Sequence, residues 1–110
     1  MTTSYFVLYS GQADDPAAFI ERYRTVHAPI LSRWPGIRGV ALHTPLAWTD
    51  PHPVRASGLT LAAQMTFDDL EALQRALASP ERTAARDDFH RFPPFPGDVF
   101  HQAMRTERLL

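Results

Sequence analysis

The sequence predicts an α+β fold, because strand-like and helix-like segments follow one another in the order β-α-β-β-α-β. Apolar residues recur every three or four positions in the helix-like segments, whereas the strand-like segments are short runs of apolar, aromatic and β-branched residues. Glycine and proline clusters separate these segments. Two split β-α-β units of this order form a four-stranded antiparallel sheet with both helices on one face, which is the ferredoxin-like arrangement.

The first strand and the first helix occupy the first third of the chain. Ser4–Tyr9 is an aromatic and β-branched run without polar alternation, which is typical of a strand covered on both faces. Asp15 followed by Pro16 begins a helix, and Trp34-Pro35-Gly36 ends it with a turn. The expected buried face of this helix recurs at steps of three and four: Phe19, Tyr23, Val26, Ile30 and Trp34.

Two further strands flank a long loop. Ile37–His43 and Leu59–Phe67 both have strand-like composition. In the second of these, every alternate residue from Leu59 to Phe67 is apolar, which predicts one buried face. Thr44–Gly58 lies between them with three prolines and no periodicity, so we expect a loop there.

The last third of the chain is expected to form a helix in two parts and a final strand. Asp68 with Glu71 three residues later is a capping-box pattern. The core stripe that follows comprises Leu70, Leu73 and Leu77. Ser79-Pro80 restarts a helical segment that runs to about Arg91, and Val99–Arg105 is expected to be the last strand.

The second face of the predicted sheet is less polar than a solvated face should be. The first strand is apolar throughout, and the third offers only Thr, Ala and Gln on that face. An exposed apolar surface of this kind needs a cover. A second copy of the same sheet, related by a twofold axis, provides one, so the sequence predicts a homodimer through the open sheet face.

Composition restricts the partners and the chemistry. The 110 residues fit one domain, residues 1–110, and a net charge of -1 gives no reason to expect binding to nucleic acid or to a membrane. The N-terminal apolar run is too short for a signal peptide or a membrane span, so we expect a cytoplasmic protein. The chain has no cysteine, and all eleven basic residues are arginine, which excludes thiolate and lysine chemistry. Histidines and carboxylates must therefore do most of any proton transfer.

Three motifs resemble the signatures of the EthD family. They are His27-Ala28-Pro29, Trp34-Pro35-Gly36-Ile37 and Asp88-Phe89-His90-Arg91-Phe92, in this order along the chain. The resemblance implies a dimeric α/β barrel with a cavity between the helices and the sheet. Proteins related to this family include methylmuconolactone isomerases, polyketide-processing enzymes, cofactor-free oxygenases and haem-handling proteins. Fold similarity alone does not choose among these activities.

His27 is the principal candidate for catalysis. Pro29 cannot donate a hydrogen bond to Thr25, and Ala28 before it is pushed away from helical dihedral angles, so the helix should kink or loosen here. His27 then lies beside the core stripe, where a neutral imidazole can give and take a proton near neutral pH. Asp88 is the candidate to orient it. The structural alternative is that His27 caps a freed carbonyl and that Asp88 pairs with Arg91 or Arg24.

Several other residues are candidates for the site. His52 in the long loop lies near the position of an acid/base histidine in the isomerases that the chain resembles. Tyr23, Trp34 and Phe92 belong to an aromatic set whose surplus can line an apolar pocket. His101 either lines the cavity or is a core histidine with its hydrogen bonds satisfied. No pair of histidines has helical metal-ligand spacing, so we expect no metal site.

These observations predict an enzyme that uses no cofactor and performs acid/base catalysis on a small apolar carbonyl, lactone or polyketide-like substrate. Isomerisation, dehydration and cyclisation all fit a single histidine that moves a proton. Two alternatives stay open: an oxygenase or haem-handling barrel, and a cavity that binds a ligand without changing it.

Overall fold

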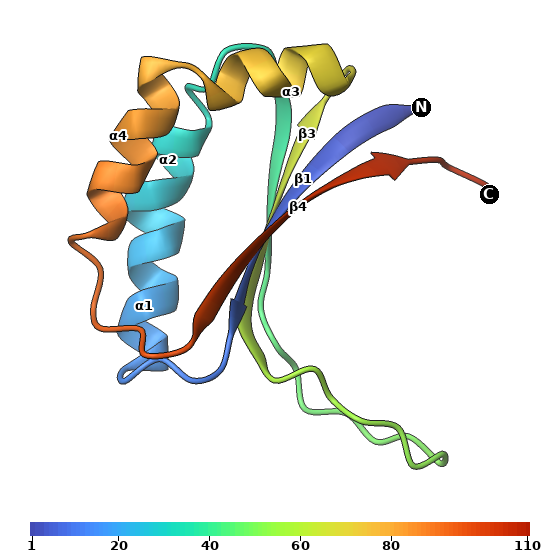
Figure 1. The fold of residues 1–110 in the computed structure, drawn as a ribbon. Coiled ribbons are helices and arrows are strands. Elements are labelled where there is room, and N and C mark those ends of the chain that lie inside the picture. The colour runs from blue at the N-terminus through green and yellow to red at the C-terminus, as the bar shows by residue number, and fades with distance from the viewer.

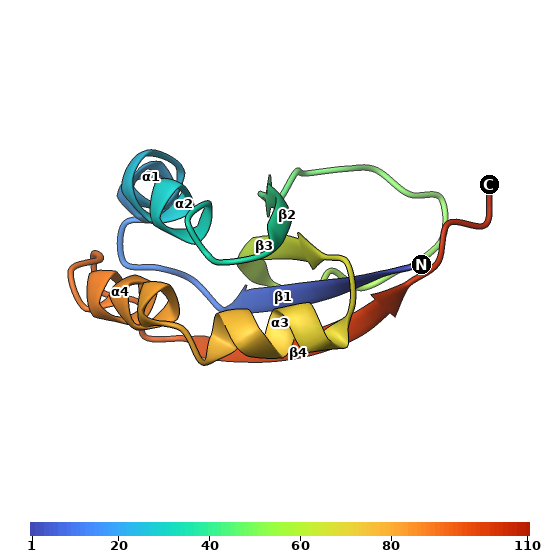
Figure 2. The same ribbon diagram turned by 90° about the horizontal axis from the view of Figure 1, so that it is seen from above.

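A computed structural model describes residues 1–110 and confirms the predicted fold. The elements are β1 (Thr2–Ser10), α1 (Pro16–Arg22), the π-helical segment η1 (Tyr23–His27), α2 (Ala28–Leu31), β2 (Ile37–His43), β3 (Leu59–Phe67), α3 (Leu70–Leu77), α4 (Pro80–Phe89) and β4 (Asp98–Thr106). The strands form one antiparallel sheet in the order β2-β3-β1-β4. All helices cover the same face of this sheet, and α4 lies beside α1 and α2 (Figures 1 and 2). None of them is both long enough and apolar enough to cross a membrane.

The strand register decides which side chains face the helices. Tyr5 lies opposite Met65, and Val7 lies opposite Ala63 on one side and His101 on the other. Directly paired residues point to the same face of a sheet, so His101 faces the helices together with the buried residues of β1 and β3. The predicted bounds of β2 and β3 are confirmed, whereas β1 and β4 extend beyond the predicted runs at both ends.

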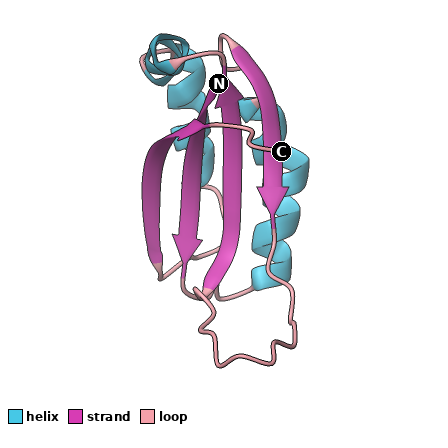
Figure 3. Cartoon of the chain, turned by 90° about the vertical axis from the view of Figure 1, so that its right-hand side faces the viewer, coloured by secondary structure: helices cyan, strands magenta, loops and turns pink.

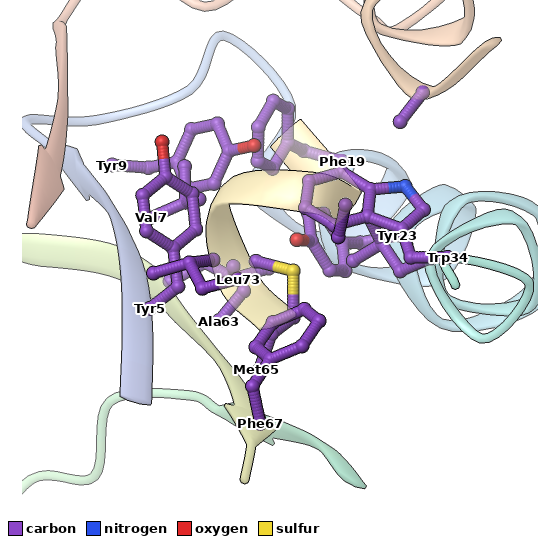
Figure 4. Close-up of a cluster of buried hydrophobic side chains, with 14 of the residues drawn as sticks. Tyr5, Val7, Tyr9, Phe19, Tyr23, Trp34, Ala63, Met65, Phe67 and Leu73 are labelled. Carbon is purple, nitrogen blue, oxygen red and sulfur yellow. The ribbon is translucent and has the colours of Figure 1, made fainter. Parts of the chain in front are cut away.

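The core lies between the sheet and the helices and is rich in aromatic rings. Phe19 is fully buried, and its ring packs against those of Tyr9, Phe89, Phe92 and Phe95 with centroid separations of 5.0 to 6.4 Å. Figure 4 shows Tyr9, Phe19 and Tyr23 gathered between β1 and the first helix. Aromatic rings in such tilted and edge-on contacts stabilise a core beyond the area that they bury.

The helical run α1–η1–α2 corresponds to the first predicted helix. Beyond Tyr23, its buried positions lie one residue later in the chain than predicted. His27 and Leu31 are buried, whereas Val26 is exposed and Ile30 is only half-buried. The π-helical turn is the cause, because it contains one residue more than an α-helical turn and shifts the inward position along the chain by one. The chain then tightens at Trp34, whose N–H donates to the carbonyl of Leu31, so that Trp34 is buried as predicted.

The π-helical turn also explains how Pro29 is accommodated. The N–H of Ala28 donates to the carbonyl of Tyr23, five residues earlier, so the helix is loosened where the sequence predicts it. The predicted departure of Ala28 from helical dihedral angles is wrong, since its φ is -59° and its ψ is -41°. The widened turn gives the proline ring room that a regular turn lacks. His27 does not cap a carbonyl, because the one hydrogen bond of its side chain goes to Asp88.

The start of α3 is one residue later than predicted. Asp69 is the N-cap, and its carboxylate accepts a hydrogen bond from the N–H of Ala72. Asp68 instead forms an exposed ion pair with Arg38 on β2 at 2.9 Å. The helix begins at Leu70, which is 52% exposed and does not belong to the core stripe as predicted. The buried residues of α3 are Ala72, Leu73 and Ala76.

Replacing Asp69 by alanine should lower the free energy of unfolding by about 1 kcal/mol, because an N–H of the first turn of α3 loses its acceptor. Urea denaturation followed by circular dichroism measures this difference. Asp68→Ala is the matched control on the neighbouring residue, and its effect should be smaller because an exposed ion pair contributes little. A larger loss of stability in Asp68→Ala than in Asp69→Ala would contradict this assignment and support Asp68 as the N-cap.

The second face of the sheet carries no helix and is seen in front of the helices in Figure 3. Phe100 and Met104 of β4 are 54% and 50% exposed on this face. The loop between β2 and β3, residues 44–58, extends away from the sheet on the same side (Figure 1). We refer to residues 44–58 as the arm; its exposed apolar side chains are Leu46, Trp48 and Val54.

Candidate active site

A cavity of about 200 Å³ lies between the helices and the sheet. Its buried end consists of residues from β1, β3, η1, α2 and the turn after α2: Val7, Tyr9, Tyr23, His27, Leu31, Trp34 and Met65. Its mouth lies between α4 and β4, where Arg86, His90 and His101 are exposed. The cavity is therefore apolar inside and carries its titratable groups at one inner wall and at the mouth.

His27 and Asp88 form a buried pair at the inner wall. The Nδ1 atom of His27 lies 3.0 Å from Oδ2 of Asp88, and each residue is about 5% exposed or less. Arg22 donates to the other carboxylate oxygen of Asp88 at 2.5 Å. The π-helical turn places His27 inward, and the last turn of α4 brings Asp88 against it. Phe92 packs edge-on against the imidazole at a centroid distance of 5.1 Å.

The protonation states within this pair follow from its surroundings. Burial alone would raise the pKa of Asp88, but hydrogen bonds from His27 and Arg22 outweigh it and lower the pKa of Asp88 below its usual value. An ionised carboxylate can only accept, so Nδ1 of His27 carries the proton. Burial also lowers the pKa of His27, against the opposing effect of Asp88. His27 is then neutral at pH 7. Its Nε2 is a lone-pair acceptor, and the one hydrogen bond of its side chain is made by the other ring nitrogen.

The lowered pKa of His27 makes folding stability depend on pH. In the unfolded chain this histidine takes up a proton near its reference pKa of about 6.5, whereas in the folded chain it stays neutral to lower pH. The unfolded state then binds more protons, so the free energy of unfolding should fall as the pH drops from about 6.5 to the lowered folded value. Urea midpoints measured between pH 7.5 and pH 5 test this, with His27→Gln expected to flatten the slope. An equal slope in both proteins would contradict it.

Two tyrosines that line the cavity are held in their neutral form. Burial raises the pKa of Tyr9 despite a hydrogen bond with Tyr23, and burial followed by the proximity of Tyr9 raises the pKa of Tyr23 well above its usual value. The Tyr23 ring lies 4.8 Å from that of His27. A phenol that keeps its proton is a hydrogen-bond donor, so this wall can stabilise negative charge that develops on a ligand oxygen.

A second pair of polar groups lies at the other end of the cavity. The Tyr5 hydroxyl is 2.8 Å from Nδ1 of His101. Burial first, and then the positive charges of Arg82 and Arg86, lower the pKa of His101. Of the two alternatives predicted for His101, the structure shows the first: the residue is exposed and lines the mouth of the cavity.

The structure brings together most of the predicted site residues, but not all. His27, Tyr23, Trp34 and His101 line the cavity, and Asp88 stands behind His27. Phe92 supports His27 from outside the cavity lining. His52 is exposed in the arm, where its backbone N–H donates to Asp50, and it does not belong to the cavity lining of its own chain.

Sequence reasoning missed several polar residues of the site, among them Tyr5, Tyr9, Arg22, Arg82 and Arg86. The sequence contains signals for four of these residues. Tyr5 and Tyr9 are an even number of positions apart and so share one face of a strand, and Arg82 and Arg86 are four positions apart and so share one face of a helix. Arg22 replaces the predicted partners of Asp88, Arg24 and Arg91. No side chains of His, Asp and Glu converge in groups of three or more that are able to hold a metal ion.

Comparisons with known proteins identify relatives of this chain. The family model described as the EthD domain matches residues 12–93. An EthD family protein from Bacillus halodurans is similar at 28% identity, with a TM-score of 0.72 over 93% of this chain and 97% of that one. No curated protein sequence matches.

More distant structures share the fold. A variant of SnoaB, a cofactor-independent oxygenase from Streptomyces nogalater, has 18% identity and a TM-score of 0.64 over 99% of this chain and 96% of that one. A dimeric ferredoxin-like protein of unknown function from Thermobifida fusca has 12% identity and a TM-score of 0.66 over 96% of this chain and 92% of that one.

Proposed function

Because the chain belongs to the EthD family, we propose that it is an enzyme that needs no cofactor and that uses His27 to move a proton on a small, largely apolar carbonyl compound. The observation that carries this proposal is the buried His27–Asp88 pair at the wall of an apolar cavity. A neutral imidazole held by a carboxylate is well suited to general base catalysis, because the carboxylate fixes the tautomer and stabilises the imidazolium that forms.

The chemistry follows from the positions of the polar groups. Nε2 of His27 takes a proton from the carbon next to the substrate carbonyl, while Asp88 stabilises the imidazolium that forms. The hydroxyl of Tyr23 donates to that of Tyr9, which leaves the proton of Tyr9 free to form a hydrogen bond to the enolate oxygen. Return of the proton from His27 to a different atom gives isomerisation. Transfer of the same proton to a hydroxyl group on the next carbon, which leaves as water while the enolate electrons form a C=C bond, gives dehydration.

The similarity to SnoaB supports a second candidate, a cofactor-independent oxygenase. Removal of a proton from an electron-rich substrate produces an anion that can react with O₂ without a bound metal or flavin. The first step is the same in both candidates, so His27 has the same role. Oxygen consumption measured with an electrode separates them, because isomerisation and dehydration use none.

Deuterium exchange tests the shared step without knowledge of the final product. The purified protein is incubated in D₂O with a panel of small cyclic ketones and keto acids, and the proton next to the carbonyl is followed by NMR. We expect at least one compound to lose this signal faster than in protein-free buffer. Two results would count against proton transfer by His27: exchange that is equally fast in the His27→Gln variant, or no exchange in any compound of the panel.

We also propose that two chains pack through their open sheet faces. The exposed apolar residues Phe100 and Met104 and the projecting arm lie on this side, and the related Thermobifida fusca protein is dimeric. In such a dimer the arm and His52 lie at the boundary between the two subunits.

Phe100→Glu should convert this dimer into monomers, because it places a charge in an apolar interface. Analytical ultracentrifugation measures the change. Leu70→Glu is the matched control, since Leu70 has almost the same exposure, 52% against 54%, but lies on the helical side of the molecule. Dissociation by both variants, or by neither, would contradict the proposed interface.

A further inference from the structure

Two arginines at the cavity mouth lack acidic partners. Arg82 and Arg86 are four residues apart on α4, so both project from the same face of the helix toward the cavity. Neither forms a salt bridge, and the single hydrogen bond of the Arg82 side chain is a long one, 3.4 Å to a backbone carbonyl. Arg22, Arg24, Arg38 and Arg75 pair with carboxylates. Among the arginines without such a partner, only Arg82 and Arg86 line the cavity.

The acidic residues of α4 lie on its other side. Glu81, Asp87 and Asp88 line a surface groove between α4 and α2, together with Arg33 and Arg91. The fifteen residues that line the cavity include no aspartate and no glutamate. Glu81 and Asp87 thus lie in the outer groove, whereas the two guanidinium groups lie at the cavity. Asp88 is buried behind His27 and is paired with Arg22.

The charge of these two arginines extends into the cavity. It contributes, after burial, to the lowered pKa of His101. It also opposes the effect of burial on the pKa of Tyr5. Two cations at the mouth of a mostly apolar cavity favour entry and binding of an anion, and a planar guanidinium pairs well with a carboxylate.

We infer that the substrate is a small anion, no larger than one substituted ring, whose carboxylate binds Arg82 and Arg86 while its ring lies in the cavity against His27. The size follows from the volume of about 200 Å³, because an apolar cavity of about 150 Å³ holds benzene. The inference rests on the proposed function for the reaction at His27, but its binding test is independent of turnover.

Benzoate and benzamide are suitable probes because they have nearly the same shape and differ in charge. We expect benzoate to bind the protein more tightly than benzamide in NMR titrations of the backbone amides. The double variant Arg82→Gln/Arg86→Gln should weaken benzoate binding by roughly 10- to 100-fold and leave benzamide binding unchanged. Arg75→Gln is the matched control, because Arg75 is exposed on α3 and outside the cavity lining.

Three results would overturn the inference: equal affinity for the two probes, an unchanged benzoate affinity in the double variant, or no benzoate binding up to about 10 mM. Failure of the proposed function looks different. If benzoate binds with the expected dependence on Arg82 and Arg86 but no cyclic keto acid exchanges deuterium, the anion site stands and the proton transfer at His27 is rejected.

Discussion

His27→Gln is expected to reduce the deuterium exchange rate by about 10²- to 10⁴-fold, the usual contribution of a positioned general base. Glutamine can still donate a hydrogen bond to Asp88 and has a volume close to that of histidine, so the fold should be retained. The variant lacks a basic nitrogen at the cavity wall. NMR exchange kinetics under saturating substrate measure the loss, and thermal unfolding checks that the fold is intact.

His43→Gln provides the control for the loss of a histidine. His43 is exposed on the open sheet face and contacts Gln64, away from the cavity. Its replacement should leave exchange unchanged. If His27→Gln keeps most of the exchange rate, the base lies elsewhere, and His101 would be the next histidine to replace because it also lines the cavity.

Asp88→Ala is expected to be the most destabilising of the substitutions at the site. It leaves Arg22 and the Nδ1–H of His27 without an acceptor in a buried region. Removal of one partner from a buried charge pair costs about 3 to 5 kcal/mol, and the lower end applies here because the Arg22 side chain is 27% exposed and recovers some hydration. Urea denaturation measures the difference.

Asp87→Ala is the matched control, because Asp87 neighbours Asp88 on the same helix but is exposed and makes no ion pair. Its effect should stay within about 0.5 kcal/mol. Asp88→Asn adds a kinetic readout. It keeps the shape of the side chain but allows the other tautomer of His27, so the pH dependence of exchange should change as well as its rate. A rate that falls with an unchanged pH profile would indicate a structural role alone.

The fold was predictable because its strands have clear patterns. Ile37–His43 and Leu59–Phe67 have the predicted bounds, since each is delimited by glycine, proline or a cap. The low polarity of the second face of the sheet was inferred mainly from Ser4–Tyr9 of β1, which has no polar alternation. Such patterns depend only on neighbouring residues, which is why a single sequence contains them.

The errors arose where the local backbone departs from regular geometry. A constant helical period assigned Val26 and Ile30 to the core, because it contains no signal for a π-helical turn. The capping box was assigned to Asp68, but the neighbouring Asp69 carries the same side chain and is the N-cap of α3, while Asp68 pairs with Arg38 of a distant strand. The pairing of Arg22 with Asp88 likewise joins residues 66 positions apart, which no local pattern reports.

The π-helical turn has a consequence for the comparison of related sequences. It absorbs one additional residue locally, so Phe19 before it and Trp34 after it both stay in the core. A relative with a regular helix at this place would need one residue fewer to present its histidine to the same cavity. An alignment of such a relative with this chain must therefore open a single-residue gap inside a helix, and an alignment that forbids this gap would match His27 with a surface residue.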